Sequence, residues 1–160
     1  MKTREEVMAI LETIPDPEVP VLSIQDLGII RGINIKSEEE VEVMITPTYS
    51  GCPAMHLIGT QIKMELLAQG FREVRVTEIL SPPWTTDWMS EAGKQKLKAY
   101  GIAPPQYMAG EDPGEEKAKI VCPLCDSAHT QLVSRFGSTA CKALYKCLDC
   151  LEPFDYFKCH

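Results

Sequence analysis

The sequence of 160 residues contains no apolar run long enough to span a bilayer. Its first six residues include two adjacent acids, where a signal peptide would have a basic start and then an apolar segment. Internal repeats and low-complexity tracts are also missing. We therefore expect a globular, cytoplasmic protein without a membrane partner.

Basic residues are scarce, with 16 lysines and arginines against 23 aspartates and glutamates. Residues 1–116 carry a net charge of −9, whereas residues 117–160 carry +2 and have no basic run. Because phosphate contacts dominate affinity for nucleic acids, this charge argues against a nucleic-acid partner. A C-terminal module that binds nucleic acid or protein is kept only as the third alternative.

Cysteines are plentiful by comparison, and four of the seven form two Cys-x-x-Cys pairs, Cys122 with Cys125 and Cys147 with Cys150. In a reducing compartment such pairs favour metal or thiol chemistry over disulfides. Four thiolates complete a tetrahedron around one ion, and they leave no open position for substrate, which predicts a structural zinc. Iron in a rubredoxin-like site, or an iron–sulfur cluster, uses the same ligands and stays open as an alternative.

The 21 residues between the two pairs are enough for a β-hairpin, as in a zinc ribbon. Alternation predicts strands over residues 130–136 and 143–146 with a turn at Gly137-Ser138, and a third short strand over residues 154–157. Metal binding would supply most of the folding free energy of so small a module, about 10 kcal/mol.

The remainder of the chain predicts an α+β fold. Helices are expected over residues 4–14, after a capping box of Thr3 and Glu6, over 53–70 and over 84–100, where Gly101 ends the helix. Alternating residues predict a hairpin near 33–45 and a strand over 73–80. The expected architecture is a small α/β sandwich over residues 1–103, with an antiparallel hairpin and helices on the sheet. A linker rich in proline, glycine and acids (104–119) and a β-rich zinc ribbon (120–160) follow.

Cys52 stands before Pro53, and proline favours the first position of a helix, so Cys52 is predicted to be the N-cap. Free N–H groups and the helix dipole stabilise a thiolate there and favour a reactive thiol. A small buried thiol used as a hydrophobe is the alternative. Another alternative is an enzyme nucleophile with His56, one turn later, as its base.

Taken together, the chain resembles the PaaD-type subunit of the phenylacetyl-CoA epoxidase system of phenylacetate degradation over nearly its whole length. Its N-terminal part resembles the small domain of SufT-type iron–sulfur assembly factors. The motifs that carry this resemblance are Asp16-Pro-Glu18, Asp26-Leu-Gly28, Thr46-Pro-Thr48, Gly51-Cys-Pro53 and Trp84-Thr-Thr-Asp-Trp88. Residues 136–145 and 152–160 resemble the ribbon tail of that subunit.

The resemblance implies a non-catalytic accessory protein that assembles or delivers an iron or iron–sulfur centre to the epoxidase. It implies as partners a di-iron oxygenase subunit, a reductase subunit that carries an iron–sulfur cluster, and the iron–sulfur assembly machinery. A structural subunit of the epoxidase complex, or a thiol-dependent enzyme that uses Cys52, is the alternative. The sequence leaves a homodimer open.

In this reading Cys52 handles transient iron or a cluster, and Asp16 and Glu18 are candidate oxygen ligands. Asp16 as a turn-former that binds its own backbone is the alternative. One thiol cannot hold a cluster, so a partner, a second chain or glutathione would complete the ligation. The candidates for lining the site are Thr46, Thr48, Gly51, Trp84, Asp87 and Trp88, although the tryptophans also suit packing on the sheet. The residues Cys141, Cys159 and His160 have no assigned role and are either spare or a second soft site.

Overall fold

The computed structural model describes residues 1–48, 51–107, 119–139 and 141–158. The chain forms two compact units, Met1–Trp84 and Thr85–His160, and each is described by itself. Across the described ranges, every helix is too short or too polar to cross a membrane.

The first unit begins with helix α1 (Arg4–Leu11), which has the predicted capping box. The Glu6 N–H donates to Thr3 Oγ1 at 3.2 Å, and the Thr3 N–H donates to Glu6 Oε2 at 2.7 Å. The helix ends earlier than predicted. Its last turn tightens, with the Ile14 N–H bonded to the Leu11 carbonyl at 3.1 Å, before the chain reaches a proline that cannot continue the helix.

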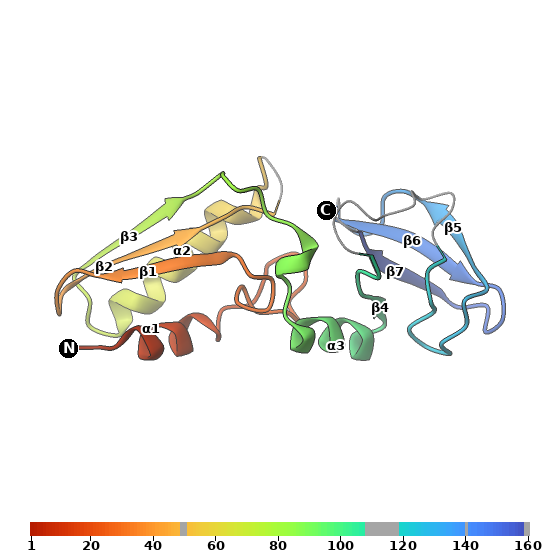
Figure 1. Ribbon diagram of the computed structural model, residues 1–160, viewed down its shortest axis with the longest axis horizontal. Coiled ribbons are helices and arrows are strands. Elements are labelled where there is room, and N and C mark those ends of the chain that lie inside the picture. Colours follow the sequence, from red (N-terminus) through yellow and green to blue (C-terminus); the bar gives the residue numbers. More distant parts are fainter. Residues whose placement is uncertain (49–50, 108–118, 140, 159–160) are drawn as a thin grey trace. The chain divides into compact units, whose positions relative to one another are not determined.

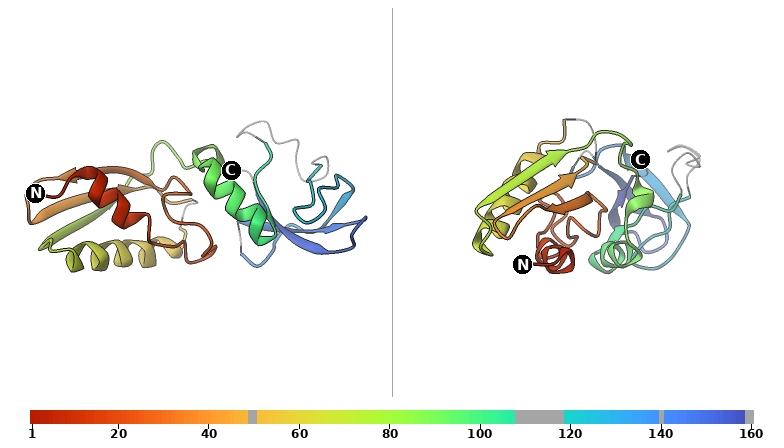
Figure 2. Two further views of the ribbon diagram at one scale, coloured as in Figure 1. Left: turned by 90° about the horizontal axis from the view of Figure 1, so that it is seen from below. Right: turned by 60° about the vertical axis from the view of Figure 1, so that its left-hand side comes forward.

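A three-stranded sheet forms the other layer of the first unit, in the order β1 (Ile30–Ile35), β2 (Glu40–Ile45) and β3 (Glu73–Glu78). The predicted antiparallel hairpin is β1 with β2, while β3 is parallel to β2. Helix α2 (Ala54–Ala68) connects the two parallel strands and covers one face of the sheet (Figures 1 and 2). Alternate residues of β2 are fully buried against this helix layer, which confirms the predicted two-layer α/β arrangement.

The second unit opens with a short 3₁₀ helix, η1 (Thr86–Trp88), and helix α3 (Glu91–Tyr100). The predicted continuous helix over residues 84–100 is wrong, because Met89 is extended with ψ 139°. Ser90 then starts a new helix by accepting the Gly93 N–H at 3.0 Å. Gly101 ends that helix with φ 91°, as predicted.

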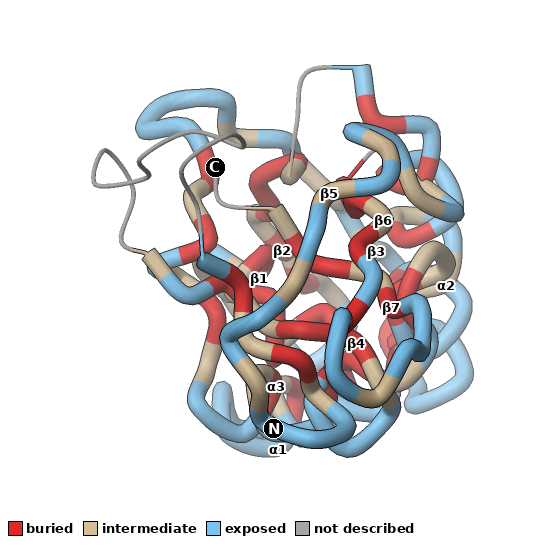
Figure 3. The backbone as a smooth tube through the Cα atoms, turned by 90° about the vertical axis from the view of Figure 1, so that its right-hand side faces the viewer, coloured by how far each residue is buried: buried red, intermediate tan, exposed pale blue. Residues whose placement is uncertain are grey.

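Strands β4 (Ile102–Ala103), β5 (Thr130–Ser134), β6 (Lys142–Cys147) and β7 (Pro153–Phe157) form one sheet in the order β4-β7-β6-β5. The three predicted ribbon strands are confirmed as β5, β6 and β7, each antiparallel to the next. The Tyr145 ring stacks on Phe154 at 6.0 Å and meets Tyr156 edge-on at 5.6 Å between centroids. In Figure 3 the buried residues of this sheet, in red, lie on β4, β6 and β7, whereas β5 has none.

The predicted domain boundary at residues 103 and 104 differs from the division between the compact units. Strand β4 pairs with β7, and the Lys98 ammonium of α3 lies 2.8 Å from the Asp126 carboxylate, so α3 and β4 belong to the ribbon unit. Of the predicted linker, residues 108–118 lie outside the described residues. The assignment of residues 1–103, 104–119 and 120–160 as separate domains stays a prediction.

Candidate metal centre and thiol site

The four ribbon cysteines lie together, with all their sulfur atoms within 4.8 Å of one another. Cys122 Sγ is 3.8 Å from Cys150 Sγ, and Cys125 Sγ is 3.5 Å from Cys147 Sγ. A tetrahedral ion with metal–sulfur bonds of about 2.3 Å places its sulfurs about 3.8 Å apart. Over the described residues this is the one group of three or more potential ligands that lie so close. The cluster therefore fits a tetrahedral metal ion.

Two loops of the same construction supply these sulfurs, and we call residues 122–127 and 147–152 the first and second knuckle. In each, the N–H of the first residue donates to the carbonyl of the sixth, at 2.8 Å in the first knuckle and 3.0 Å in the second. In each, the fifth residue has a positive φ, 61° at Asp126 and 68° at Leu151. This left-handed residue lets each loop close tightly enough to turn both sulfurs to one side.

Backbone N–H groups within the knuckles point at sulfur. The Leu124 N–H donates to Cys122 Sγ at 3.4 Å, and the Cys150 N–H donates to Cys147 Sγ at 3.5 Å. The Cys150 N–H is the main reason why the pKa of Cys147 falls to about 6. The Ser127 N–H likewise lowers the pKa of Cys125. The hydrogen bond between the Cys125 and Cys147 side chains, together with burial, outweighs it and raises the pKa of Cys125 to about 12. Cys125 and Cys147 therefore share one proton in the metal-free ribbon, and a bound metal ion would displace that proton.

A polar clasp joins the two knuckles on their exposed side. It consists of Ser127 from the first knuckle, Asp149 from the second, and His129. The Ser127 hydroxyl donates to the Asp149 carboxylate, and His129 Nδ1 lies 3.3 Å from Asp149 Oδ1. The His129 N–H donates to Ser127 Oγ at 3.0 Å. The hydrogen bond from Ser127, and then the one from His129, lower the pKa of Asp149. Sequence reasoning missed this clasp, although the acid inside the second Cys-x-x-Cys pair was a signal for it.

In the first unit, Cys52 lies beside the start of α2. The structure makes Pro53 the N-cap, with φ −66° and ψ −24°, so the prediction that Cys52 is the N-cap is wrong by one residue. The backbone of Pro53 is already helical, and the Cys52 carbonyl accepts the Met55 N–H at 3.2 Å. The Cys52 side chain is 9% exposed, and its sulfur lies 3.9 Å from the Thr48 hydroxyl.

A hollow of about 350 Å³ opens beside this thiol. Its lining includes Cys52, His56 in the first turn of α2, and Glu78, the last residue of β3. Its apolar wall comes from the residues Pro47, Met55 and Leu80. The hollow therefore lies at the carboxyl ends of the parallel strands β2 and β3, where α/β units commonly bind ligands. Gly51, with φ 75°, also lines it.

The predicted oxygen ligands Asp16 and Glu18 lie in the segment between α1 and β1. Asp16 is 6% exposed, and its Oδ2 accepts the N–H groups of Glu18 at 3.0 Å and Val19 at 2.7 Å. This is the turn-forming role that the sequence left open for Asp16. Within the described residues, Cys52, Asp16 and Glu18 do not gather their ligand atoms as the ribbon cysteines do. Their role as a joint iron site stays a prediction.

The other predicted lining residues are divided between the two units. Thr46 is 1% exposed, and its hydroxyl has no hydrogen-bond partner in the described part of the chain. Trp84 is buried, and its Nε1–H donates to the Leu27 carbonyl at 2.7 Å, as a packing role would require. Asp87 and Trp88 belong to η1 in the second unit, and their part in a thiol site stays a prediction.

The residues that the sequence left without a role are only partly described. Cys141 is buried, with its sulfur 2.9 Å from the Thr139 hydroxyl, which suits a spare structural thiol. Cys159 and His160 lie outside the described residues.

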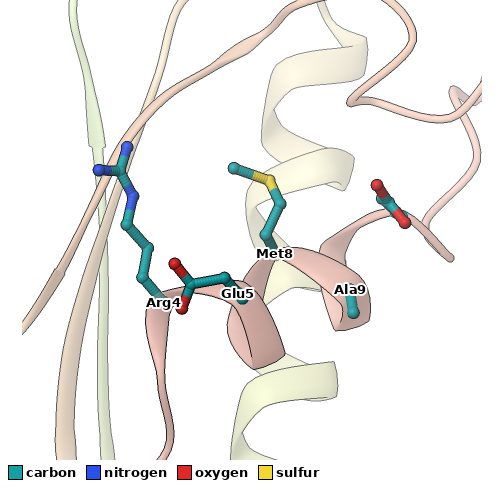
Figure 4. A pocket seen from close by; sticks show the side chains of 5 residues that line it. Arg4, Glu5, Met8 and Ala9 are labelled. Carbon is teal, nitrogen blue, oxygen red and sulfur yellow. The ribbon is translucent and has the colours of Figure 1, made fainter.

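A second hollow, of about 460 Å³, lies along α1 (Figure 4). The side chains labelled there, Arg4, Glu5, Met8 and Ala9, all come from that helix. The described lining offers no thiol or imidazole. One thioether, that of Met8, among charged and aliphatic groups on one helix does not make a site for soft-metal chemistry.

Comparisons with known proteins match a separate family model to each of the two regions that contain these sites. The family model of the iron–sulfur cluster assembly protein matches residues 4–79, and that of the PaaD zinc β-ribbon domain matches residues 108–158. A crystal structure of a domain of unknown function from Bacillus anthracis matches 58% of this chain and 89% of its own, with 27% identity and a TM-score of 0.54.

Two relatives extend the match. An iron–sulfur protein maturation auxiliary factor of Porphyromonas gingivalis is 32% identical over 61% of this chain and 92% of its own length. A candidate component of the 1,2-phenylacetyl-CoA epoxidase of Escherichia coli strain K12 is 51% identical over 96% of this chain and 92% of its own length. The chain therefore belongs to the PaaD family and joins an iron–sulfur cluster assembly domain to a zinc β-ribbon.

Proposed function

We propose that this protein is a non-catalytic accessory factor that assembles or delivers an iron or iron–sulfur centre to a phenylacetyl-CoA epoxidase. The observation that carries the proposal is the position of Cys52. It is the only cysteine in the region matched by the iron–sulfur assembly family, and it lies on the wall of an open hollow. The similarity to an epoxidase component supports the choice of recipient, and the similarity to a maturation factor supports the role.

A single thiol is suited to transfer and not to storage. Iron–sulfur clusters take about four thiolates, so Cys52 alone would hold cargo only together with a donor or a recipient. A carrier also needs ligand exchange, and a hollow open to solvent permits it. The proposed partners are the iron–sulfur assembly machinery on one side and the oxygenase and reductase subunits of the epoxidase on the other.

For the ribbon we propose a structural zinc ion. Two knuckles of the same construction supply four sulfurs at tetrahedral spacing, and four protein ligands leave no coordination position for substrate or cargo. Such an ion would stabilise the β5–β7 sheet and its aromatic core without taking part in chemistry. Metal analysis of protein purified without oxygen distinguishes zinc from iron, because iron would also give a Mössbauer signal.

The experiment for the transfer role uses cells in which the gene for this protein is deleted. Cys52→Ser should fold, because serine is of similar size, yet it should fail to support epoxidase activity or iron loading of the epoxidase. Epoxidase matured beforehand should work without this protein. Full activity with Cys52→Ser would contradict the proposal. Matured epoxidase that still needs this protein would instead favour a structural subunit.

A further inference from the structure

The two knuckles expose large apolar side chains to solvent. Leu124 in the first knuckle and Leu148 and Leu151 in the second are 57%, 37% and 63% exposed. They flank the cysteines whose sulfurs converge, so the three leucines lie beside the same cluster. Tyr100, which ends α3, is 68% exposed, and Leu124 Cδ2 lies 4.0 Å from where a Cβ on its neighbour Gly101 would be. We call Tyr100, Leu124, Leu148 and Leu151 the knuckle face.

The folding of the second knuckle does not explain why Leu151 is a leucine. Its φ of 68° lies in the left-handed region, which leucine rarely adopts, whereas the equivalent residue of the first knuckle is Asp126, a type that tolerates this region. Asparagine or aspartate would suit both the backbone and the solvent at this position. The Leu151 side chain also contributes nothing to the core around Tyr145. It is therefore available for a contact outside the chain.

The charges around the knuckle face have one sign. The two knuckles contain Asp126, Asp149 and Glu152 and no lysine or arginine, although residues 117–160 carry a net charge of +2. Lys98 Nζ lies 2.8 Å from Asp126 Oδ1 and offsets that one carboxylate. The remaining acids oppose a second copy of the same face, nucleic acid and anionic lipid. An apolar centre with an acidic rim instead complements a protein surface that has an apolar centre and a basic rim.

The two relatives indicate which protein carries that surface. The maturation factor of Porphyromonas gingivalis uses 92% of its own length to match 98 residues of this chain, so its remainder is too short for a domain like residues 108–158. The match to the Escherichia coli relative covers 96% of this chain and includes that domain. The ribbon thus accompanies the similarity to an epoxidase component, and the similarity to the maturation factor does not require it.

We propose that the knuckle face is the docking surface for the metal-free epoxidase, which presents an apolar patch rimmed by basic residues; this rests on the proposed function. The ribbon selects the recipient, and Cys52 carries the cargo. Four exposed side chains make a small interface, and small interfaces belong to weak, transient complexes. A carrier that must leave its recipient after transfer needs a complex of that kind.

The test measures binding of the zinc-saturated, full-length protein to purified metal-free epoxidase by biolayer interferometry at several salt concentrations. Leu151→Asn should weaken binding at least about tenfold, because it removes a buried leucine contact. The same variant should keep its zinc and its thermal stability, because asparagine tolerates the left-handed backbone. Leu124→Gln should weaken binding similarly. Glu152→Gln should slow association and reduce its dependence on salt.

Val133→Thr is the matched control, because Val133 is as exposed as Leu124 but lies in β5, outside the knuckles. It should bind as the unaltered protein does. The proposal is overturned if the unaltered protein does not bind the epoxidase, if Leu151→Asn and Leu124→Gln both keep full affinity, or if Val133→Thr weakens binding equally. Loss of zinc or of the ribbon fold in Leu151→Asn would also overturn it, because Leu151 would then be a folding residue.

Sedimentation of the protein alone tests the other occupant. The protein should stay monomeric at the concentrations of the binding assay. Self-association that Leu151→Asn abolishes would show that a second copy covers the knuckle face, and would overturn the proposal.

The cell assay separates this inference from the proposed function. Cys52→Ser should bind the epoxidase with unchanged affinity and still leave it inactive, whereas Leu151→Asn should lower epoxidase activity through lost binding. If the knuckle variants bind fully while Cys52→Ser fails to mature the epoxidase, only the docking surface is wrong. If Cys52→Ser supports full epoxidase activity, the transfer role fails, whatever the binding assay shows.

Discussion

At the scale of single residues, the ribbon cysteines are made unequal by the backbone around them. The Cys150 N–H lowers the pKa of Cys147 from 9.0 to about 6, and the Ser127 N–H fails to prevent the opposite shift at Cys125. A depressed thiol pKa stabilises the metal-free ribbon fully above pH 9, and this contribution is lost as the pH falls through about 6. Cys147 is therefore a thiolate at neutral pH and can bind a metal ion without first losing a proton.

This inequality predicts how metal affinity depends on pH. Above pH 6 an incoming ion displaces no proton from Cys147, whereas below pH 6 it must. A plot of the logarithm of zinc affinity against pH, from competition with a chelator of known affinity, should thus steepen by about one proton below pH 6. A slope that stays constant from pH 5 to 8 would show that Cys147 has no depressed pKa in the metal-free ribbon.

At the scale of elements, the clasp of Ser127, His129 and Asp149 joins the two knuckles beside the point where their sulfurs converge. Groups outside the ligand shell that hold metal ligands in place commonly contribute tenfold to hundredfold in affinity. Asp149 accepts from both clasp partners, so it is the member whose loss frees the knuckles most.

Asp149→Asn should therefore weaken zinc binding about tenfold and leave the metal-loaded fold unchanged. Glu152→Gln is the control, because it removes the same charge from the second knuckle without touching the clasp. Chelator competition on both variants measures the effect. Equal losses in the two variants would mean that negative charge near the metal matters, and that the clasp does not.

Sequence patterns predicted those elements whose signal is local. Alternation located both hairpins, and cysteine spacing located the metal cluster, because each depends on neighbouring residues. The helix break at Met89 was not predicted, because Ser90 is an N-cap inside an otherwise helical sequence pattern. Strand β4 was not predicted, because two residues are too few to show the alternation of buried and exposed side chains that marks a strand.

The thiol hollow could be predicted only in part, for a different reason. Cys52 and His56 are close in the sequence, so their shared face was foreseeable. Glu78 joins them only through the parallel pairing of β2 with β3, which alternation within one strand does not reveal. The predicted pair Asp16 and Glu18 came from the resemblance, and the structure shows Asp16 bonded to its own turn.

At the scale of the whole molecule, the two compact units differ in what stabilises them. The first buries the sheet face of β2 under helices and holds no predicted structural metal. The core of the second lies around Tyr145 and includes Cys122 and Cys147, two of the proposed metal ligands, so its packing and the proposed metal site share residues. Helix α3 contacts this unit through β4 and through the Lys98–Asp126 ion pair at the first knuckle.

Loss of the metal should consequently unfold more than the ribbon predicted at residues 120–160. In Cys147→Ser, hydrogen exchange measured by mass spectrometry should lose protection in β5–β7 and also in α3 (Glu91–Tyr100), because β4 and the first knuckle no longer hold that helix. The first unit should keep its protection, since its core contains none of the ligands. Cys141→Ser is the control for replacing a buried cysteine in the same unit that is not a ligand. Protection retained in α3 while β5–β7 exchange freely would place the cooperative boundary near residue 103, as the sequence predicted.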